Sequence, residues 1–227
     1  MENLIRDLKK VIEDNLNTKL PVAYFYSSLA LCLTDAIFSI SVLYQSVENT
    51  VKNLSQKLEI NIRRNGSKEF SLEQFLKILN NYSDEDLAFS LFKNKQLTST
   101  RSGITKALAV KLACKVLLDH GINNFVDVNK KRLDSAEQDF IKIKGQNSGI
   151  SYKYFCMLAG DENLIKPDRM ICRFIANSLE MKKDPTPKEA EKIFQEAFIK
   201  VSEDYPKLTP RFLDYIVWDF QRKIKKK

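Results

Sequence analysis

Residues 143–174 read IKGQNSGISYKYFCMLAGDENLIKPDRMICRF, and this stretch contains three of the six glycines in the chain. Gly145 and Gly149 lie between two segments whose apolar residues have helical spacing. Glycine adopts positive φ angles and allows another part of the chain to approach closely, so the pair predicts a tight hairpin between two helices. The Lys-Pro-Asp-Arg run that follows predicts another helix, with Pro167 at its first-turn position and Asp168 in that first turn.

The length and composition indicate a globular protein. A chain of 227 residues suits one large domain or two small lobes, and 44% hydrophobic with 29% charged residues is typical of this class. The most apolar segment, Leu20–Val47, contains Asp35 and several serines, so it predicts core helix rather than a membrane span. Asp35 is then either buried and hydrogen-bonded, which we favour, or faces a groove. The first residues lack a signal-peptide pattern, so we expect a cytoplasmic protein, nucleoid-associated if bacterial or archaeal.

The cysteines and the single histidine indicate structural roles. The cysteines are far apart and form no Cys-x-x-Cys motif, so we expect reduced core thiols and no metal site. They are Cys32, Cys114, Cys156 and Cys172. His120 falls in the last turn of a predicted helix that ends at Gly121, where an imidazolium would interact well with the helix dipole. We favour this role for His120 over a catalytic one.

The charge balance allows two interpretations. The formal net charge is +8 and the sequence pI is about 9.2. A basic excess of this kind suits a polyanionic partner such as a nucleic acid. It also occurs in lysine-rich proteins that bind no polyanion, so the charge alone does not separate the two.

The rest of the chain has helical apolar spacing and helix-capping signals, while strand signals are confined to Leu58–Ile62. The fold class is therefore all-α, with about ten helices. They are predicted over Leu4–Ile12, over Ala23–Leu58 with one break, and from starts at or near Ser71, Ser83, Ser102, Asp134, Ile150, Pro167, Thr186 and Thr209.

The hairpin is a candidate anion site. The helix that follows it would offer unbonded N–H groups at Ile150 and Ser151, and the hairpin would add others over Gln146–Gly149. Such groups, together with the helix dipole, suit a phosphate, and contacts to backbone atoms ignore base sequence. Lys144 and Lys153 flank the turn and add positive charge. The alternative is that the two glycines only form a tight corner between helices.

The segment Ser102–Phe174 resembles the helix–hairpin–helix superfamily of base-excision DNA glycosylases. The helices over Ala23–Leu58 and Thr186–Arg222 also fit the family's order, so the resemblance covers most of the chain. Five features occur in the same order as in the family: the helix opening Ser102–Ala107, the apolar helix to His120-Gly121, the spacer helix ending at Phe140–Ile143, the hairpin Lys144–Gly149 with its helix, and Asp168 followed by Arg169 and Arg173.

The resemblance implies a two-lobed architecture. Residues 24–160 would form a central helical lobe that ends in the helix–hairpin–helix motif. Residues 1–23 and 161–227 would form a second helical lobe, with a groove between the two. The implied partner is double-stranded DNA, contacted mainly through its phosphate backbone by a monomer, and no membrane.

The resemblance also implies roles for individual residues. Asp168 would activate water or stabilise the oxocarbenium-like transition state as the base leaves. Bifunctional family members carry a nucleophilic lysine where this chain has Ile150, so the implied activity is monofunctional hydrolysis of an N-glycosidic bond of a damaged or modified base. The candidate DNA contacts are Arg101, Lys144, Gly145, Gln146, Asn147, Ser148, Gly149, Ile150, Ser151, Lys153, Lys166 and Arg169. The candidate base-pocket residues, each of which could instead lie in the core, are Phe38, Tyr44, Tyr152 and Tyr154.

Several features depart from the family pattern. The hairpin is longer and more polar than the family's Pro-Gly-apolar-Gly hairpin, which binds an alkali-metal ion, so we expect no cofactor. The glutamine-bearing wedge loop has no match near Ala36, where the sequence predicts continuous helix, and the C-terminal four-cysteine cluster is absent. Two alternatives stay open: a catalytically inactive family member that binds nucleic acid or a partner, and an unrelated all-helical regulator or adaptor.

Overall fold

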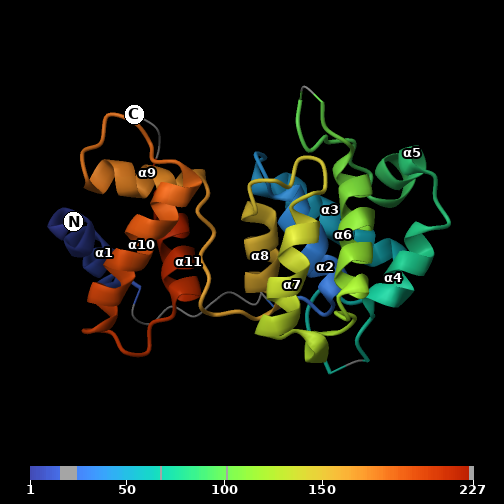
Figure 1. Ribbon diagram of the computed structural model, residues 1–227, viewed down its shortest axis with the longest axis horizontal. Helices are drawn as coiled ribbons and strands as arrows, with labels where there is room; N and C mark the ends of the chain where they lie inside the picture. Colours follow the sequence, from blue (N-terminus) through green and yellow to red (C-terminus); the bar gives the residue numbers. More distant parts are fainter. Residues whose placement is uncertain (16–24, 67, 101, 225–227) are drawn as a thin grey trace. The chain divides into compact units, whose positions relative to one another are not determined.

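The computed structural model describes residues 1–15, 25–66, 68–100 and 102–224, and its regular elements there are all helical (Figure 1). The only β-type pairings in the described part are the isolated bridges Tyr26–Arg63 and Leu97–Thr105. The prediction of an all-α fold with about ten helices is confirmed. The α-helices are α1 (Glu2–Glu13), α2 (Leu29–Phe38), α3 (Tyr44–Lys57), α4 (Leu72–Leu79), α5 (Asp84–Asp86), α6 (Lys106–Asp119), α7 (Lys130–Phe140), α8 (Ile150–Ala159), α9 (Arg169–Ser178), α10 (Pro187–Ser202) and α11 (Pro210–Lys223).

The chain divides into two compact units. Unit 1 consists of Met1–Leu20 and Asp161–Lys227, and unit 2 of Pro21–Gly160. The lobe boundary predicted between residues 23 and 24 lies outside the described residues.

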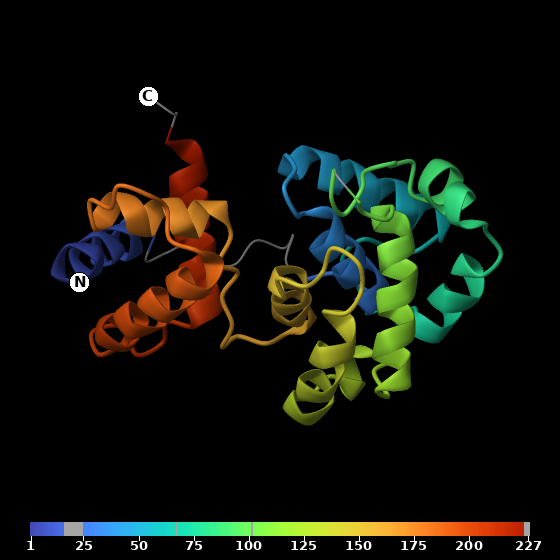
Figure 2. The ribbon, with the colours of Figure 1, turned by 45° about the horizontal axis from the view of Figure 1, so that its top comes forward.

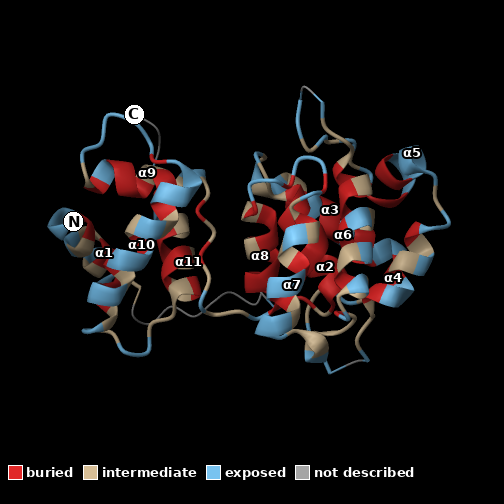
Figure 3. Ribbon diagram, in the orientation of Figure 1, coloured by how far each residue is buried: buried red, intermediate tan, exposed pale blue. Residues whose placement is uncertain are grey.

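Unit 2 is built around α2, and all ten of its residues are buried (Figure 3). Its sequence, LALCLTDAIF, is apolar on every side, as expected of a helix enclosed by others. Helices α3, α6 and α8 pack against it. Asp35 accepts hydrogen bonds from the hydroxyls of Tyr26 at 2.8 Å and Tyr44 at 3.3 Å. The favoured interpretation of Asp35 as a buried, hydrogen-bonded residue is thereby confirmed.

Unit 1 packs α1, α9, α10 and α11 around a second core, with α11 packed across α9 (Figure 2). Apolar residues at helical spacing face this core because each helix has one apolar side. The fully buried members are Leu4, Leu8, Ile171, Ile175, Ala190, Phe194, Ala197, Val201, Leu213 and Val217.

Helix α2 begins at Leu29, after the cap Ser28, rather than near Ala23. The predicted starts of α6 and α7 are also wrong. Helix α6 begins after Thr105, whose Oγ1 accepts the N–H of Leu108 at 3.1 Å, rather than after Ser102. Helix α7 begins after Asn129, so Asp134 lies inside the helix rather than at its cap. In both cases a second capping residue outcompetes the predicted one. The predicted caps at Ser71, Ser83, Thr186 and Thr209 are confirmed.

Candidate functional site

The hairpin between α7 and α8 has the glycine conformations that the sequence predicts. Gly145 has φ 87°, and Gly149 has φ 71° and forms the N-cap of α8. The N–H of Gln146 donates to the carbonyl of Ile143 at 2.8 Å, and that of Gly149 to the carbonyl of Gln146 at 3.0 Å. The hairpin is therefore two linked turns that lead directly into α8.

A second loop, Gln96–Thr105, packs against this hairpin through Thr98. A Cβ atom placed on Gly145 would lie 2.4 Å from both Cβ and Oγ1 of Thr98, so only glycine fits. Thr98 is fixed in turn, because its N–H donates to the carbonyl of Ile104 at 2.8 Å and its Oγ1 accepts the N–H of Ile104 at 3.2 Å. The two loops lie at the same end of unit 2 (Figure 1).

The predicted DNA contacts in the hairpin separate into inward and outward groups. Gln146 and Ser151 are 3% and 1% exposed, and the Ser151 hydroxyl donates to Oε1 of Gln146. Their side chains therefore pin the hairpin to α8 and are not available to a ligand. Asn147 and Ser148 are exposed, and within the described residues their backbone N–H groups have no acceptor.

The opening of α8 offers fewer N–H groups than the sequence predicts. The N–H of Ile150 has an acceptor, Oγ of Ser148, at 3.4 Å. Ile150 itself is half-buried and supplies no amine at the position of the family's lysine. Ser151 is buried, so the N–H groups that belong to exposed residues are those of Asn147 and Ser148.

The predicted basic contacts have different surroundings. Lys144 is exposed beside the hairpin, and Lys153 is half-buried on α8. Arg101 lies outside the described residues. Lys142, which was not predicted as a contact, is already paired with Asp139 at 2.8 Å. Lys144 is thus the exposed cation next to Asn147 and Ser148.

The one break predicted within Ala23–Leu58 is a turn between α2 and α3, and the chain is helical around Ala36, as the sequence predicts. Helix α2 ends at Phe38, Ser41 has φ 60°, and Leu43 is 83% exposed. The turn is fixed by Lys106, which is only 3% exposed and whose Nζ donates to the carbonyls of Phe38 at 3.0 Å and Ile40 at 2.7 Å.

Lys106 also ties this turn to the loop that carries Thr98. Its Nζ lies 3.4 Å from Oε1 of Gln96, two residues before Thr98. The turn after α2, the Gln96–Thr105 loop and the hairpin are therefore linked through named contacts within unit 2. The sequence signal that could have revealed the turn is the Ser-Ile-Ser run at 39–41.

The predicted base-pocket aromatics do not gather around a cavity. Phe38 stacks on Phe92 with a centroid distance of 5.4 Å and is fully buried. Tyr152 is 3% exposed, packs on Phe140 at 4.9 Å and donates its hydroxyl to the carbonyl of Leu133 at 2.6 Å. Tyr154 is also buried, whereas Tyr44 is half-buried and bonded to Asp35. Phe38 and Tyr152 are thus core residues, which was the alternative for each.

Asp168, in unit 1, forms the N-cap of α9 rather than lying in its first turn. Its Oδ1 accepts the N–H groups of Met170 at 2.7 Å and Ile171 at 3.3 Å. Pro167 precedes the cap, so its predicted first-turn position is wrong. If Pro167 were the first helical residue, Lys166 would be the N-cap. Aspartate is a better cap than lysine, and the Asp168 carboxylate accepts two N–H groups of α9. Oδ2 of Asp168 has no hydrogen-bond donor within the described residues.

Two further predicted contacts flank Asp168. Arg169 is exposed and Lys166 is half-buried. The backbone of Lys166 bonds on both sides: its carbonyl accepts the N–H of Asp168 at 2.6 Å, and its N–H donates to Oδ1 of Asp214 at 2.9 Å. Asp214, which sequence reasoning missed, is 7% exposed on α11.

His120 is held by a serine and an aspartate but does not form a catalytic triad. Its Nδ1 lies 3.1 Å from Oγ of Ser135 and its Nε2 2.9 Å from Oδ2 of Asp139. The Ser135 hydroxyl donates its hydrogen to the carbonyl of Arg132 at 2.8 Å, so it is the acceptor of the His120 contact. A serine in that arrangement cannot transfer its proton to the imidazole.

The cysteines are buried thiols with little thiolate character. All four side chains are buried. Burial raises the pKa of Cys114 to about 12 and that of Cys172 to about 11, the latter with help from Asp168 and Asp184. Within the described residues, no group of three or more His, Cys, Asp or Glu side chains is placed to hold a metal ion.

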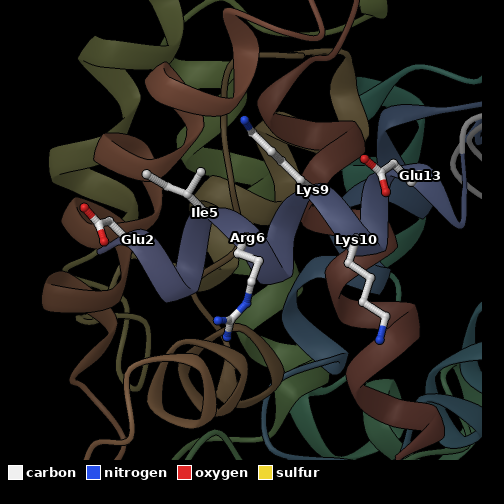
Figure 4. A pocket seen from close by; sticks show the side chains of 6 residues that line it. All are labelled: Glu2, Ile5, Arg6, Lys9, Lys10 and Glu13. Carbon is white, nitrogen blue, oxygen red and sulfur yellow. The ribbon is translucent and has the colours of Figure 1, made fainter.

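Two surface hollows of the described part lie away from these residues. One, of about 580 Å³, is lined by side chains of α1 alone, which point away from a single helix and enclose nothing (Figure 4). The other, of about 450 Å³, lies in unit 2 beside Arg64, whose guanidinium sits 3.9 Å from the ring centroid of Phe125. Neither is lined by the hairpin or by Asp168.

Comparison with known proteins gives one family assignment. No curated protein and no solved structure matches the chain. Over the residues that the structure describes, no helix combines the length and apolarity needed to cross a membrane. The profile of a domain family of unknown function, DUF8548, matches residues 2–222, and the chain therefore belongs to the DUF8548 family.

Proposed function

We propose that this protein binds double-stranded DNA through the hairpin end of unit 2 and hydrolyses the N-glycosidic bond of a damaged or modified base with Asp168. The observation that carries the proposal is the hairpin. It presents the exposed N–H groups of Asn147 and Ser148 beside the exposed cation of Lys144. Backbone donors and a lysine together match a phosphate oxygen and ignore base sequence.

The turn after α2 supports contact with a duplex. It places Leu43, 83% exposed, on the part of unit 2 that Lys106 and Gln96 link to the hairpin. An apolar side chain inserted into a duplex can occupy the gap that an extruded base leaves, and extrusion costs a few kcal/mol. Leu43 thereby supplies a filling residue that the sequence pattern lacks.

The Asp168 carboxylate supports the chemistry. Its Oδ1 is held by two helix N–H groups, which leaves Oδ2 to face a substrate. As the base departs with the electrons of the N-glycosidic bond, the sugar becomes oxocarbenium-like and a carboxylate stabilises it. Water then bonds to C1′ and gives its proton to Asp168, while the departing base takes up a proton. Ile150 offers no amine for a Schiff base, so the strand stays intact.

The direct test is base release from duplexes that each carry one modified base, read with and without hot alkali. The panel would contain 8-oxoguanine, uracil, alkylated adenine, hypoxanthine and thymine glycol. We expect breaks only after alkali for wild type and none for Asp168→Asn. Asparagine caps a helix as well as aspartate, so this variant keeps the fold and loses only the charge. The matched control is Asp184→Asn, which changes an exposed carboxylate of unit 1 and should leave release unchanged.

A second candidate function is a DNA-binding protein without catalysis. The specific observation in its favour is that capping α9 is already a complete structural role for Asp168. This candidate expects salt-sensitive binding to every duplex, because neutralised phosphates release counterions, and no base release from any. Breaks without alkali would contradict both candidates, since they require a lysine nucleophile.

A further inference from the structure

The segment that leads from unit 2 into α9 is clamped at one point by the start of α11. The N–H of Arg211 donates to the carbonyl of Glu162 at 3.1 Å, and its Nη1 donates to Oε1 of the same glutamate at 2.8 Å. The Thr209 hydroxyl donates to Oε2 of Glu162 at 3.1 Å. Arg211 is only 2% exposed, so this clamp is anchored inside unit 1. It fixes the segment six residues before Asp168.

The second clamp lies next to Asp168. Oδ1 of Asp214 accepts the N–H of Lys166 at 2.9 Å, and the carbonyl of Lys166 accepts the N–H of Asp168 at 2.6 Å. Pro167, between them, has a fixed φ and no N–H of its own. Lys166 therefore connects the two aspartates, with its N–H bonded to Asp214 and its carbonyl to the N–H of Asp168, and the fixed φ of Pro167 limits the freedom of the chain between them.

We propose that Asp214 is a positioning residue for Asp168, which it holds through the backbone of Lys166. This inference rests on the proposed function, because it assigns a task to Asp214 in the reaction of Asp168. Asp214 touches no substrate atom in this scheme. Its contribution is to keep Oδ2 of Asp168 in one orientation while Oδ1 caps α9.

The charge state of Asp214 also affects the turn that contains Asp168. Burial raises the pKa of Asp214 well above the ordinary aspartate range, and the nearby charge of Asp168 raises it further, while Lys166 and Arg211 lower it. A protonated Asp214 still accepts the N–H of Lys166 and adds no second negative charge beside Asp168. Ionisation of Asp214 as pH rises would strengthen its bond to the Lys166 N–H but would place a second negative charge near Asp168, and the two carboxylates would repel each other.

The test compares Asp214→Asn and Asp214→Ala with wild type in single-turnover base release across pH. Asparagine keeps an acceptor for the Lys166 N–H but cannot ionise, so its release should lack the decline with rising pH that ionisation of Asp214 causes in wild type. Alanine removes the acceptor, and release should fall about 100-fold, as expected for a displaced catalytic group. The control is Asp219→Asn, on the same helix, whose carboxylate pairs instead with Arg222 at 2.8 Å and with Lys223. It should behave as wild type.

A measurement without DNA separates this inference from the proposed function. Hydrogen exchange of the Lys166 and Asp168 backbone amides is followed by NMR in wild type, Asp214→Ala, Asp214→Asn and Asp219→Asn. We expect faster exchange in Asp214→Ala, which lacks the acceptor for the Lys166 N–H, and wild-type exchange in the two asparagine variants, whether or not the protein releases a base. Unchanged exchange in Asp214→Ala, or full release by it, would overturn the positioning role. Absence of release by wild type would refute the glycosylase proposal alone.

Discussion

The hairpin of unit 2 and the Asp168 turn of unit 1 are both short connections that lead into a helix, but they are held in opposite ways. The hairpin is fixed by two glycine conformations and one neutral pair, Gln146 with Ser151. The Asp168 turn is fixed by ionisable side chains, chiefly Asp214 and Arg211. A connection held by glycines leaves backbone N–H groups exposed for a ligand, whereas one held by buried acids and bases depends on pH.

The largest effect that we expect comes from adding one methyl group to the hairpin. Gly145→Ala combines a positive φ with a Cβ 2.4 Å from Thr98, so unit 2 should lose on the order of 2–5 kcal/mol of unfolding free energy. Urea denaturation of full-length protein measures this. Gly66→Ala is the matched control, because Gly66 has φ 81° but nothing within 4 Å of the added Cβ. Equal losses in the two variants would show that the contact with Thr98 does not matter.

The next effect tests whether unit 2 also depends on a buried charge. Lys106→Met keeps the length of the side chain but removes the donor for the carbonyls of Phe38 and Ile40. Leaving buried acceptors unpaired should cost about 2–3 kcal/mol of unfolding free energy. Lys115→Met, an exposed position on the same helix, is the control and should change stability little. A stable Lys106→Met protein with an unchanged melting temperature would contradict the role of Lys106 as the cap of α2.

The pH dependence of stability tests the Asp168 turn of unit 1. Because the pKa of Asp214 is raised in the folded state, the folded state binds more protons than the unfolded state. The stabilisation is therefore complete below the ordinary aspartate pKa and is lost as pH rises through the folded-state pKa. The slope from this one group is at most about 1.4 kcal/mol per pH unit. Thermal unfolding from pH 4 to 9 should show a shallower decline for Asp214→Asn than for wild type.

The smallest expected effect concerns the exposed cation of the hairpin. Lys144→Ala should reduce the slope of log binding constant against log salt concentration by about one, with a uniform loss of affinity across DNA sequences. Lys142→Ala is the control, because Asp139 already neutralises that side chain. Fluorescence anisotropy of a labelled duplex at several salt concentrations gives both slopes. Equal slopes for Lys144→Ala and wild type would remove Lys144 from the interface.

The sequence predicts the features that depend on local chemistry. The all-α class, the caps at Thr186 and Thr209 and the glycine conformations of the hairpin all follow from residues within a few positions of one another. The sequence predicts one break within Ala23–Leu58, but apolar spacing alone does not place it after Phe38, because that spacing continues through Ile40 and Leu43. It is Lys106, far along the chain, that caps the end of α2.

The candidate site shows the same limit. Asp168 stands out in the sequence, but its position as an N-cap depends on competition between adjacent residues. Asp214 gives no local signal at all, since its partner is a backbone N–H on a different segment. Gln146 and Ser151 look like polar surface residues and are buried because each satisfies the other. Contacts between distant segments therefore decide which polar residues face a ligand.

The enclosure of α2 has a consequence for how unit 2 opens. Helices α3, α6 and α8 each make their most extensive packing contact with it, so all three lose that contact once α2 is lost. The backbone amides of α2 should therefore exchange with deuterium only through global unfolding of the unit, and they should be its slowest. The exposed amides of Asn147 and Ser148 should exchange without global unfolding of unit 2. The hairpin can thus adjust to a bound molecule while the centre of the unit stays closed.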